Sequence, residues 1–72
     1  MNSNKGTAVI PEELESVLRD NPAEGEFFHS LADRYKRGYS EWVGEAKKPL
    51  TRQARAAKAL IMLRRKQETL ET

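Results

Sequence analysis

Hydrophobic side chains recur every three or four residues along most of this chain, which is the spacing of one face of an α-helix. The longest such stretch runs from Glu45 to Lys66. Read as a helix, it gathers on one side Ala56, Ala57, Leu60, Ile61 and Leu63. The opposite side then carries Arg52, Arg55, Lys58 and Arg65. The pattern predicts an amphipathic helix with an apolar face toward the core and a basic face toward solvent.

Three shorter helices are predicted upstream of this stretch. Residues 11–20 begin with a proline, which suits a first helical position, followed by two glutamates that favour the positive end of the helix dipole. Asn21-Pro22-Ala23-Glu24 is a start signal of capping-box type for a second helix, and Asp33 is the expected cap of a third. Pro49 disfavours helical geometry at the residue before it, so the chain should turn there. The last helix is expected to end near Glu68.

No stretch alternates with period two, so the predicted fold class is all-α, a compact bundle of four short helices. Residues 1–9 are polar and without period and predict a flexible tail, and residues 10–72 form a single domain. The chain has no cysteine, so packing must stabilise it. The predicted core consists chiefly of Phe27, Phe28, Leu31, Tyr39, Trp42, Val43, Leu60 and Ile61, and Leu50 and Ala57 are also expected in it. If Trp42 is buried, truncating it is expected to cost the most, about 3 to 5 kcal/mol.

Charge is distributed unevenly along the chain, although the formal net charge is only +2. Residues 11–33 hold seven acidic residues and one basic residue, whereas residues 46–67 hold eight basic residues and no acidic one. Such asymmetry bears on partners and on self-association, so a homo-oligomer stays open. No apolar run reaches the length of a membrane span, and the N-terminus lacks the apolar core of a signal peptide, so a cytoplasmic protein is expected.

The sequence also resembles a known family. The segment FFHSL, followed by RGYSEWVGEAKKPLTRQARAAKALIML, is similar to the C-terminal helical domain of the YdeI/OmpD-associated family, also called bacteriocin-protection proteins. The resemblance covers about Ile10 to Met62. Its matching positions are Tyr39, Trp42, Ala46-Lys47, Thr51-Arg52 and Arg55.

Two positions depart from that family pattern. This chain has Ala32-Asp33 where the family often has Ser or Pro, and Ala56 where the family has a second arginine. The resemblance implies a bacterial helical domain and does not indicate one activity. Many members carry a separate N-terminal domain, and an activity located there is not carried over to this chain.

The basic face is the strongest candidate site. Lysine and arginine side chains that contact phosphates release condensed counterions, and arginine adds bidentate hydrogen bonds. The alternative is a solvated face, partly neutralised by the acidic first two helices of the same fold. The partner-binding candidates are Lys47, Lys48, Arg52, Arg55, Lys58, Met62, Arg65 and Lys66.

Two parts of this set have structural interpretations of their own. Arg52 and Arg55 lie one turn apart and could clamp the last two helices together through Glu41 and Glu45, because arginine matches carboxylate geometry well. Met62 lies among cations, where it is either an interface anchor or a singly exposed methionine.

The remaining chemistry-bearing residues predict no catalytic centre. Tyr35, Tyr39 and Trp42 could stack on bases if they were exposed, but their helical spacing favours the core. His29 is the only histidine, so a metal site would have to combine it with carboxylates such as Glu26 and Asp33. No nucleophile has a base near it in the sequence. We therefore expect no enzyme, cofactor or metal, but an interaction module that binds a protein or anionic partner through its basic C-terminal helix, with nucleic acid as the alternative.

Overall fold

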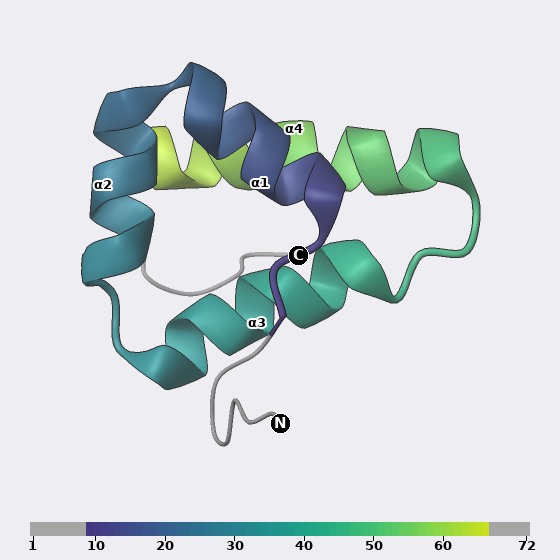
Figure 1. The fold of residues 1–72 in the computed structure, drawn as a ribbon, viewed down its shortest axis with the longest axis horizontal. Helices are drawn as coiled ribbons and strands as arrows, with labels where there is room; N and C mark the ends of the chain where they lie inside the picture. The colour runs from purple at the N-terminus through teal and green to yellow at the C-terminus, as the bar shows by residue number, and fades with distance from the viewer. Residues whose placement is uncertain (1–8, 67–72) are drawn as a thin grey trace.

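The computed structural model of the chain describes residues 9–66, and within this range it contains four helices and no strand. The helices are α1 (Glu12–Asp20), α2 (Pro22–Ser30), α3 (Asp33–Gly44) and α4 (Pro49–Arg64). The all-α prediction is confirmed (Figure 1). The predicted N-terminal tail falls outside the described residues except for Val9. The prediction that the last helix ends near Glu68 is wrong, because α4 ends at Arg64 and Lys66 has a positive φ angle of 64°.

Proline residues mark the helix starts as expected, but the predicted side-chain caps do not form. Pro22 and Pro49 each occupy the first position of a helix, whereas Pro11, which was also expected at a first position, is the N-cap residue of α1. Asn21 does not cap α2 with its side chain; instead its Nδ2 donates to the carbonyl oxygen of Val17 at 2.8 Å and closes the end of α1. Ala32, not Asp33, is the N-cap residue of α3.

α4 is the element against which the other three helices pack. Its most extensive contacts are with α1 and then with α3, while α2 lies across one end of the assembly (Figure 1). α1 and α2 approach each other closely because residue 25 is glycine. A Cβ atom at Gly25 would lie 2.9 Å from the carbonyl oxygen of Leu18, which is too close for any side chain to fit without a shift.

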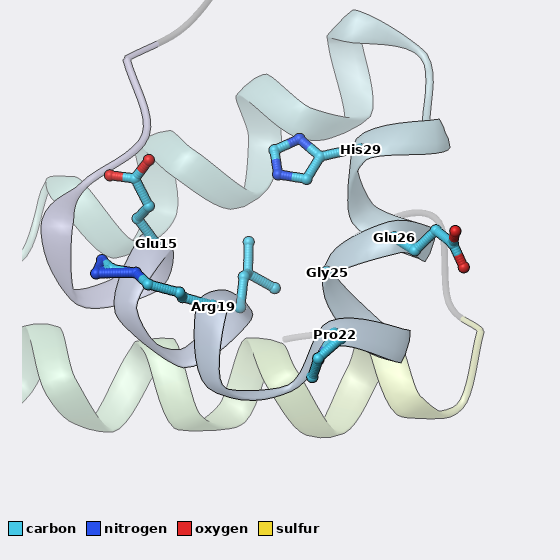
Figure 2. Close-up of a pocket in the computed structure, with 7 residues that line it drawn as sticks. Glu15, Arg19, Pro22, Gly25, Glu26 and His29 are labelled. Carbon is cyan, nitrogen blue, oxygen red and sulfur yellow. The ribbon is translucent and has the colours of Figure 1, made fainter.

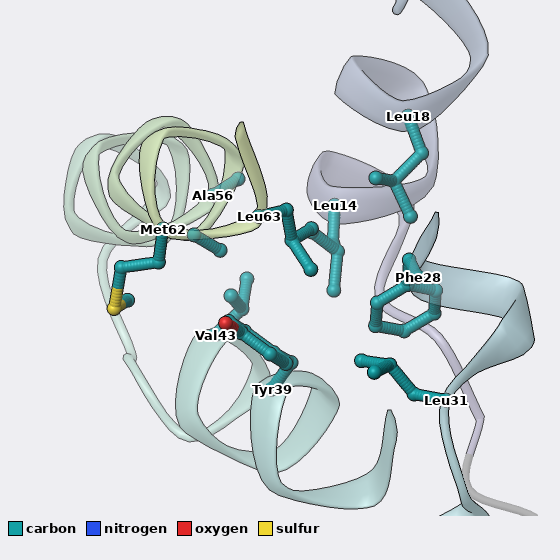
Figure 3. Close-up of a cluster of buried hydrophobic side chains, with 10 residues drawn as sticks. Leu14, Leu18, Phe28, Leu31, Tyr39, Val43, Ala56, Met62 and Leu63 are labelled. Atoms are coloured by element: carbon teal, nitrogen blue, oxygen red, sulfur yellow. The ribbon is translucent and has the colours of Figure 1, made fainter. Parts of the chain in front are cut away.

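Side chains from all four helices form the core (Figure 3). α4 supplies Ala56, Ala59, Met62 and Leu63, and the other helices and the α2–α3 connection supply Leu14, Leu18, Phe28, Leu31, Tyr39 and Val43. The rings of Phe28 and Tyr39 meet edge to face with centroids 6.0 Å apart. Phe27 and Trp42 are half-buried at the edge of this core, and Leu60 is also half-buried.

The prediction was wrong about which face of α4 is buried. Ile61 is 47% exposed and Leu50 is 78% exposed, and Ala57 is exposed as well, whereas Met62 is only 4% exposed. The helix is therefore rotated by roughly one residue position from the predicted orientation. The physical reason is that Arg52 and Arg55 lie on the buried side of α4, where they bond to backbone carbonyl groups of α3.

Candidate interaction surface

Arg52 joins three parts of the fold. Its Nη1 donates to the carbonyl oxygens of Gly44, at 2.8 Å, and Ala46, at 3.4 Å, and its Nη2 lies 3.1 Å from Glu13 Oε1. The guanidinium thereby satisfies carbonyl groups at the end of α3 that have no partner within the helix. The side chains of Arg52 and Glu13 are only about a quarter exposed, at 28% and 25%. Arg52 is a link between α1, α3 and α4, not a free cation.

Arg55 makes a second link between α3 and α4. Its Nη1 donates to the carbonyl oxygen of Trp42 at 2.8 Å and lies 3.5 Å from Glu45 Oε2. The guanidinium carbon also lies 5.4 Å from the centroid of the Trp42 ring. The predicted clamp between the last two helices is present, with Glu45 as one partner as expected. Arg52, however, pairs with Glu13 of α1 rather than with Glu41.

The end of α4 is tied to α2 in a similar way. Arg64 Nε donates to Glu24 Oε2 at 2.9 Å, and the Lys66 ammonium lies 5.0 Å from the centroid of the Phe27 ring. The hydrogen bond from Arg64 stabilises the charged form of the Glu24 carboxylate and so lowers the pKa of Glu24. The interaction with Arg52 likewise lowers the pKa of Glu13.

Four of the predicted partner-binding cations are not used in this way. Lys47, Lys48, Lys58 and Arg65 are exposed, and none forms an ion pair with another residue in the range 9–66. We call these four side chains the open cations. Arg52 and Arg55 have to be removed from the candidate surface because their guanidinium groups are engaged within the fold. Met62 has to be removed because it is buried in the core.

The two tyrosines that were weighed as stacking platforms are wholly or partly enclosed by the fold. Tyr39 is fully buried, and burial raises the pKa of its hydroxyl. Tyr35 is half-buried and accepts a hydrogen bond from Arg34 at 3.1 Å. Within the described range no three residues among His, Asp and Glu come together to hold a metal ion.

An open cleft between α1 and α2 also includes polar groups. It is lined by Glu15, Leu18, Arg19, Pro22, Gly25, Glu26 and His29. Figure 2 shows the Glu26 carboxylate directed away from the His29 ring, so this carboxylate and the imidazole do not converge on one point. The cleft therefore has the form of a helix–helix groove with scattered polar groups.

A comparison with known proteins identifies the family. A family model described as "OmdA: Bacteriocin-protection, YdeI or OmpD-Associated" matches residues 7–66, which is most of the chain. The chain belongs to this family. No curated protein and no solved structure shows significant similarity to it. The description is that of the family and names no reaction.

Several residues on which the resemblance to the OmdA family rests lie at the junction between α3 and α4. The positions on which the resemblance was recognised include Trp42, Ala46, Arg52 and Arg55. The structure brings these four together at the α3–α4 junction, where both arginines donate to backbone carbonyl groups. In this chain, the two arginines on which the family resemblance rests bond across the junction between α3 and α4.

None of the helices in the described part of the chain is both long enough and apolar enough to cross a membrane.

Proposed function

We propose that this OmdA-family chain is a small, non-catalytic module that binds an acidic surface of a partner protein through the open cations. The observation that supports the proposal is the division of the basic residues. The fold uses Arg52, Arg55 and Arg64 internally but leaves Lys58 exposed on α4, Lys47 and Lys48 exposed before it, and Arg65 exposed just after it.

The chemistry of these cations suits recognition of an acidic surface. Lysine holds a compact, strongly hydrated charge on a flexible stem, so it attracts an opposite charge at long range without demanding one geometry. Exposed cations of this kind raise the association rate with an acidic partner and make binding depend on ionic strength. Loss of the open cations should therefore weaken binding more at low salt than at high salt.

The same cations would also attract phosphate groups, which is the nucleic-acid alternative. The engagement of Arg52 and Arg55 counts against it, because bidentate arginine is the better phosphate ligand. If all four open cations contacted phosphates, the logarithm of the affinity would fall with the logarithm of salt concentration at a slope of about −3.6. A slope near zero with duplex DNA would contradict this alternative.

Affinity capture from a lysate of the source cell, with and without nuclease treatment, tests the proposal. The test variant carries Lys47→Gln, Lys48→Gln, Lys58→Gln and Arg65→Gln. A matched control removes the same number of positive charges elsewhere through Arg19→Gln, Arg34→Gln, Lys36→Gln and Arg37→Gln. Circular dichroism establishes that both variants are folded before they are compared.

The proposal predicts proteins that the wild type and the control retain in nuclease-treated lysate and that the test variant loses. If retention disappears on nuclease treatment, the nucleic-acid alternative replaces the proposal. If the test variant retains the same proteins as the control, or if the wild type retains none, the open cations are a solvated surface without a partner.

A further inference from the structure

The rotation of α4 leaves a row of apolar side chains facing outward. These are Leu50, Ala54, Ala57 and Ile61, all of them exposed. Leu50 is 78% exposed and Ile61 is 47% exposed. We call this row the outer stripe. It lies on the opposite side of α4 from Ala59 and Met62, which face the core.

The spacing of the outer stripe distinguishes it from scattered exposed residues. Its members follow one another at intervals of four, three and four residues, which is the repeat of a coiled-coil seam. The two large side chains stand at its ends and two alanines lie between them, so a partner helix can approach closely at the centre. At a rise of 1.5 Å per residue the stripe is about 16 Å long, or about three helical turns.

Positive charge borders the C-terminal half of this stripe. Lys58 and Arg65 lie on one edge of it and Arg64 on the other, and residues 46–66 contain no acidic side chain. In a pair of packed helices, the residues beside the apolar seam choose the partner through their charges. The complement of this surface is a helix with an apolar seam flanked by glutamate or aspartate.

The described residues of a second copy, 9–66, do not provide that complement. Within residues 9–66 the exposed large hydrophobic side chains are Val9, Leu50 and Ile61, so the largest apolar contact between copies through these side chains joins one α4 to another. Whether the two α4 helices run parallel or antiparallel, that contact places cations of one copy against cations of the other, and neither α4 contains an acidic residue. Like charges across a seam oppose pairing.

We propose that the outer stripe docks an acidic amphipathic helix of a partner protein, with Leu50 and Ile61 in its seam and Lys58 and Arg65 opposite its carboxylates. This inference rests on the proposed function and adds to it the kind of partner and the way it binds. Helix docking of this kind reads side chains at intervals of three and four residues. Because the stripe is short, the contact belongs with small, weak interfaces, and a dissociation constant on the order of 10 to 100 µM is expected.

A designed helical peptide serves as the probe. It spans three heptads, about 21 residues, with leucine and alanine in the seam and glutamate on both flanks. Repulsion between glutamates keeps it from pairing with itself. A second peptide has glutamine in place of every glutamate. Fluorescence anisotropy of the labelled peptides, titrated with the full chain at low salt, gives the affinities.

Three variants of the chain test which of its side chains contact the peptide. Leu50→Gln with Ile61→Gln removes the seam and keeps helix propensity, and it should weaken binding about 10-fold or more. Lys58→Gln with Arg65→Gln should weaken binding about 3- to 10-fold, and replacing the glutamates of the probe should have a similar effect. Val9→Gln is the matched control, because it removes an equally exposed hydrophobic side chain elsewhere, and it should change nothing.

The inference is overturned if the glutamate peptide does not bind, or if the Leu50→Gln, Ile61→Gln variant binds it as tightly as the wild type. If the Leu50→Gln, Ile61→Gln variant binds as tightly as the wild type but the variant without the open cations does not bind the peptide, the proposed function is retained and only the role of the outer stripe is lost. Sedimentation velocity adds one more contradicting result, a wild-type dimer that Leu50→Gln with Ile61→Gln dissolves, because the occupant would then be a second copy. The lysate capture judges the proposed function independently of the peptide.

Discussion

Arg52 and Lys58 lie six residues apart on α4 and carry the same charge, but they belong to different regions of the molecule. Arg52 reaches the end of α3 and Glu13 of α1, whereas Lys58 is exposed and forms no ion pair within residues 9–66. The fork of a guanidinium can satisfy two carbonyl groups and a carboxylate together, and a lysine ammonium has no such fixed geometry. A count of basic residues therefore overstates the charge that a partner can meet.

The largest effect should come from adjacent residues on the two faces of α4. Met62→Gln places an amide in the core and should lower the free energy of unfolding by about 3 kcal/mol. Ile61→Gln, one residue earlier and facing outward, should change it by less than about 1 kcal/mol. Chemical denaturation measures both. Equal losses, or a larger loss for Ile61→Gln, would mean that α4 is not rotated as described.

A smaller difference separates the arginine clamp from the open cations. Arg52→Gln leaves the carbonyl oxygens of Gly44 and Ala46 without their donor and should lower the free energy of unfolding by about 1 to 3 kcal/mol. Lys58→Gln should stay within about 0.5 kcal/mol. Arg52→Lys keeps the charge and loses the fork, so it should fall between the two. If Arg52→Lys matches the wild type, charge alone explains the role of Arg52.

The pH dependence of stability should show the same division in milder form. The pKa of Glu13 and that of Glu24 are lowered in the folded state from an ordinary value of 4.5, so each stabilising contribution is complete above that value. It is lost as pH falls through the lower folded-state pKa. Stability should therefore decline between about pH 5 and pH 3, and Arg52→Gln should make this decline shallower.

The control for this pH series is an open cation. Lys58→Gln should leave the shape of the curve unchanged, because no carboxylate in the described part of the chain pairs with Lys58. Denaturation midpoints across the pH range give both curves. Parallel curves for wild type and Arg52→Gln would show that the ion pair with Glu13 contributes nothing to folding.

The parts of this structure that follow local rules could be predicted from the sequence. Pro22 and Pro49 begin helices because a proline ring has the φ angle of a helix and the first turn needs no N–H from it. The aromatic and aliphatic spacing around Phe28 and Tyr39 placed both in the core, and the family was recognised from the same region. Each of these inferences used neighbours within a few residues.

The orientation of α4 could not be predicted in this way. The helix carries apolar residues on every side, so more than one apolar stripe can be drawn along it, and Ile61 is more hydrophobic than the alanines that are in fact buried. The choice depends on Arg52, whose partners include Glu13 of α1 and the backbone of Gly44. Contacts between residues so far apart in the chain produce no periodic pattern of residue types that could be recognised in the sequence. The sequence also could not show which basic residues bond within the fold. The candidate site was therefore predicted as one basic face, whereas the structure divides it into arginines bonded within the fold and the open cations.

Thiol reactivity tests the central claim, the orientation of α4, most directly, because the chain has no cysteine of its own. Single substitutions Leu50→Cys, Ala59→Cys, Ile61→Cys and Met62→Cys are each mixed with a thiol reagent under native conditions. Cysteines at 50 and 61 should react about as fast as they do in the unfolded chain, and those at 59 and 62 should react at least about 100-fold more slowly, because they wait for the helix to open. Protection at 61 together with rapid reaction at 62 would contradict the account.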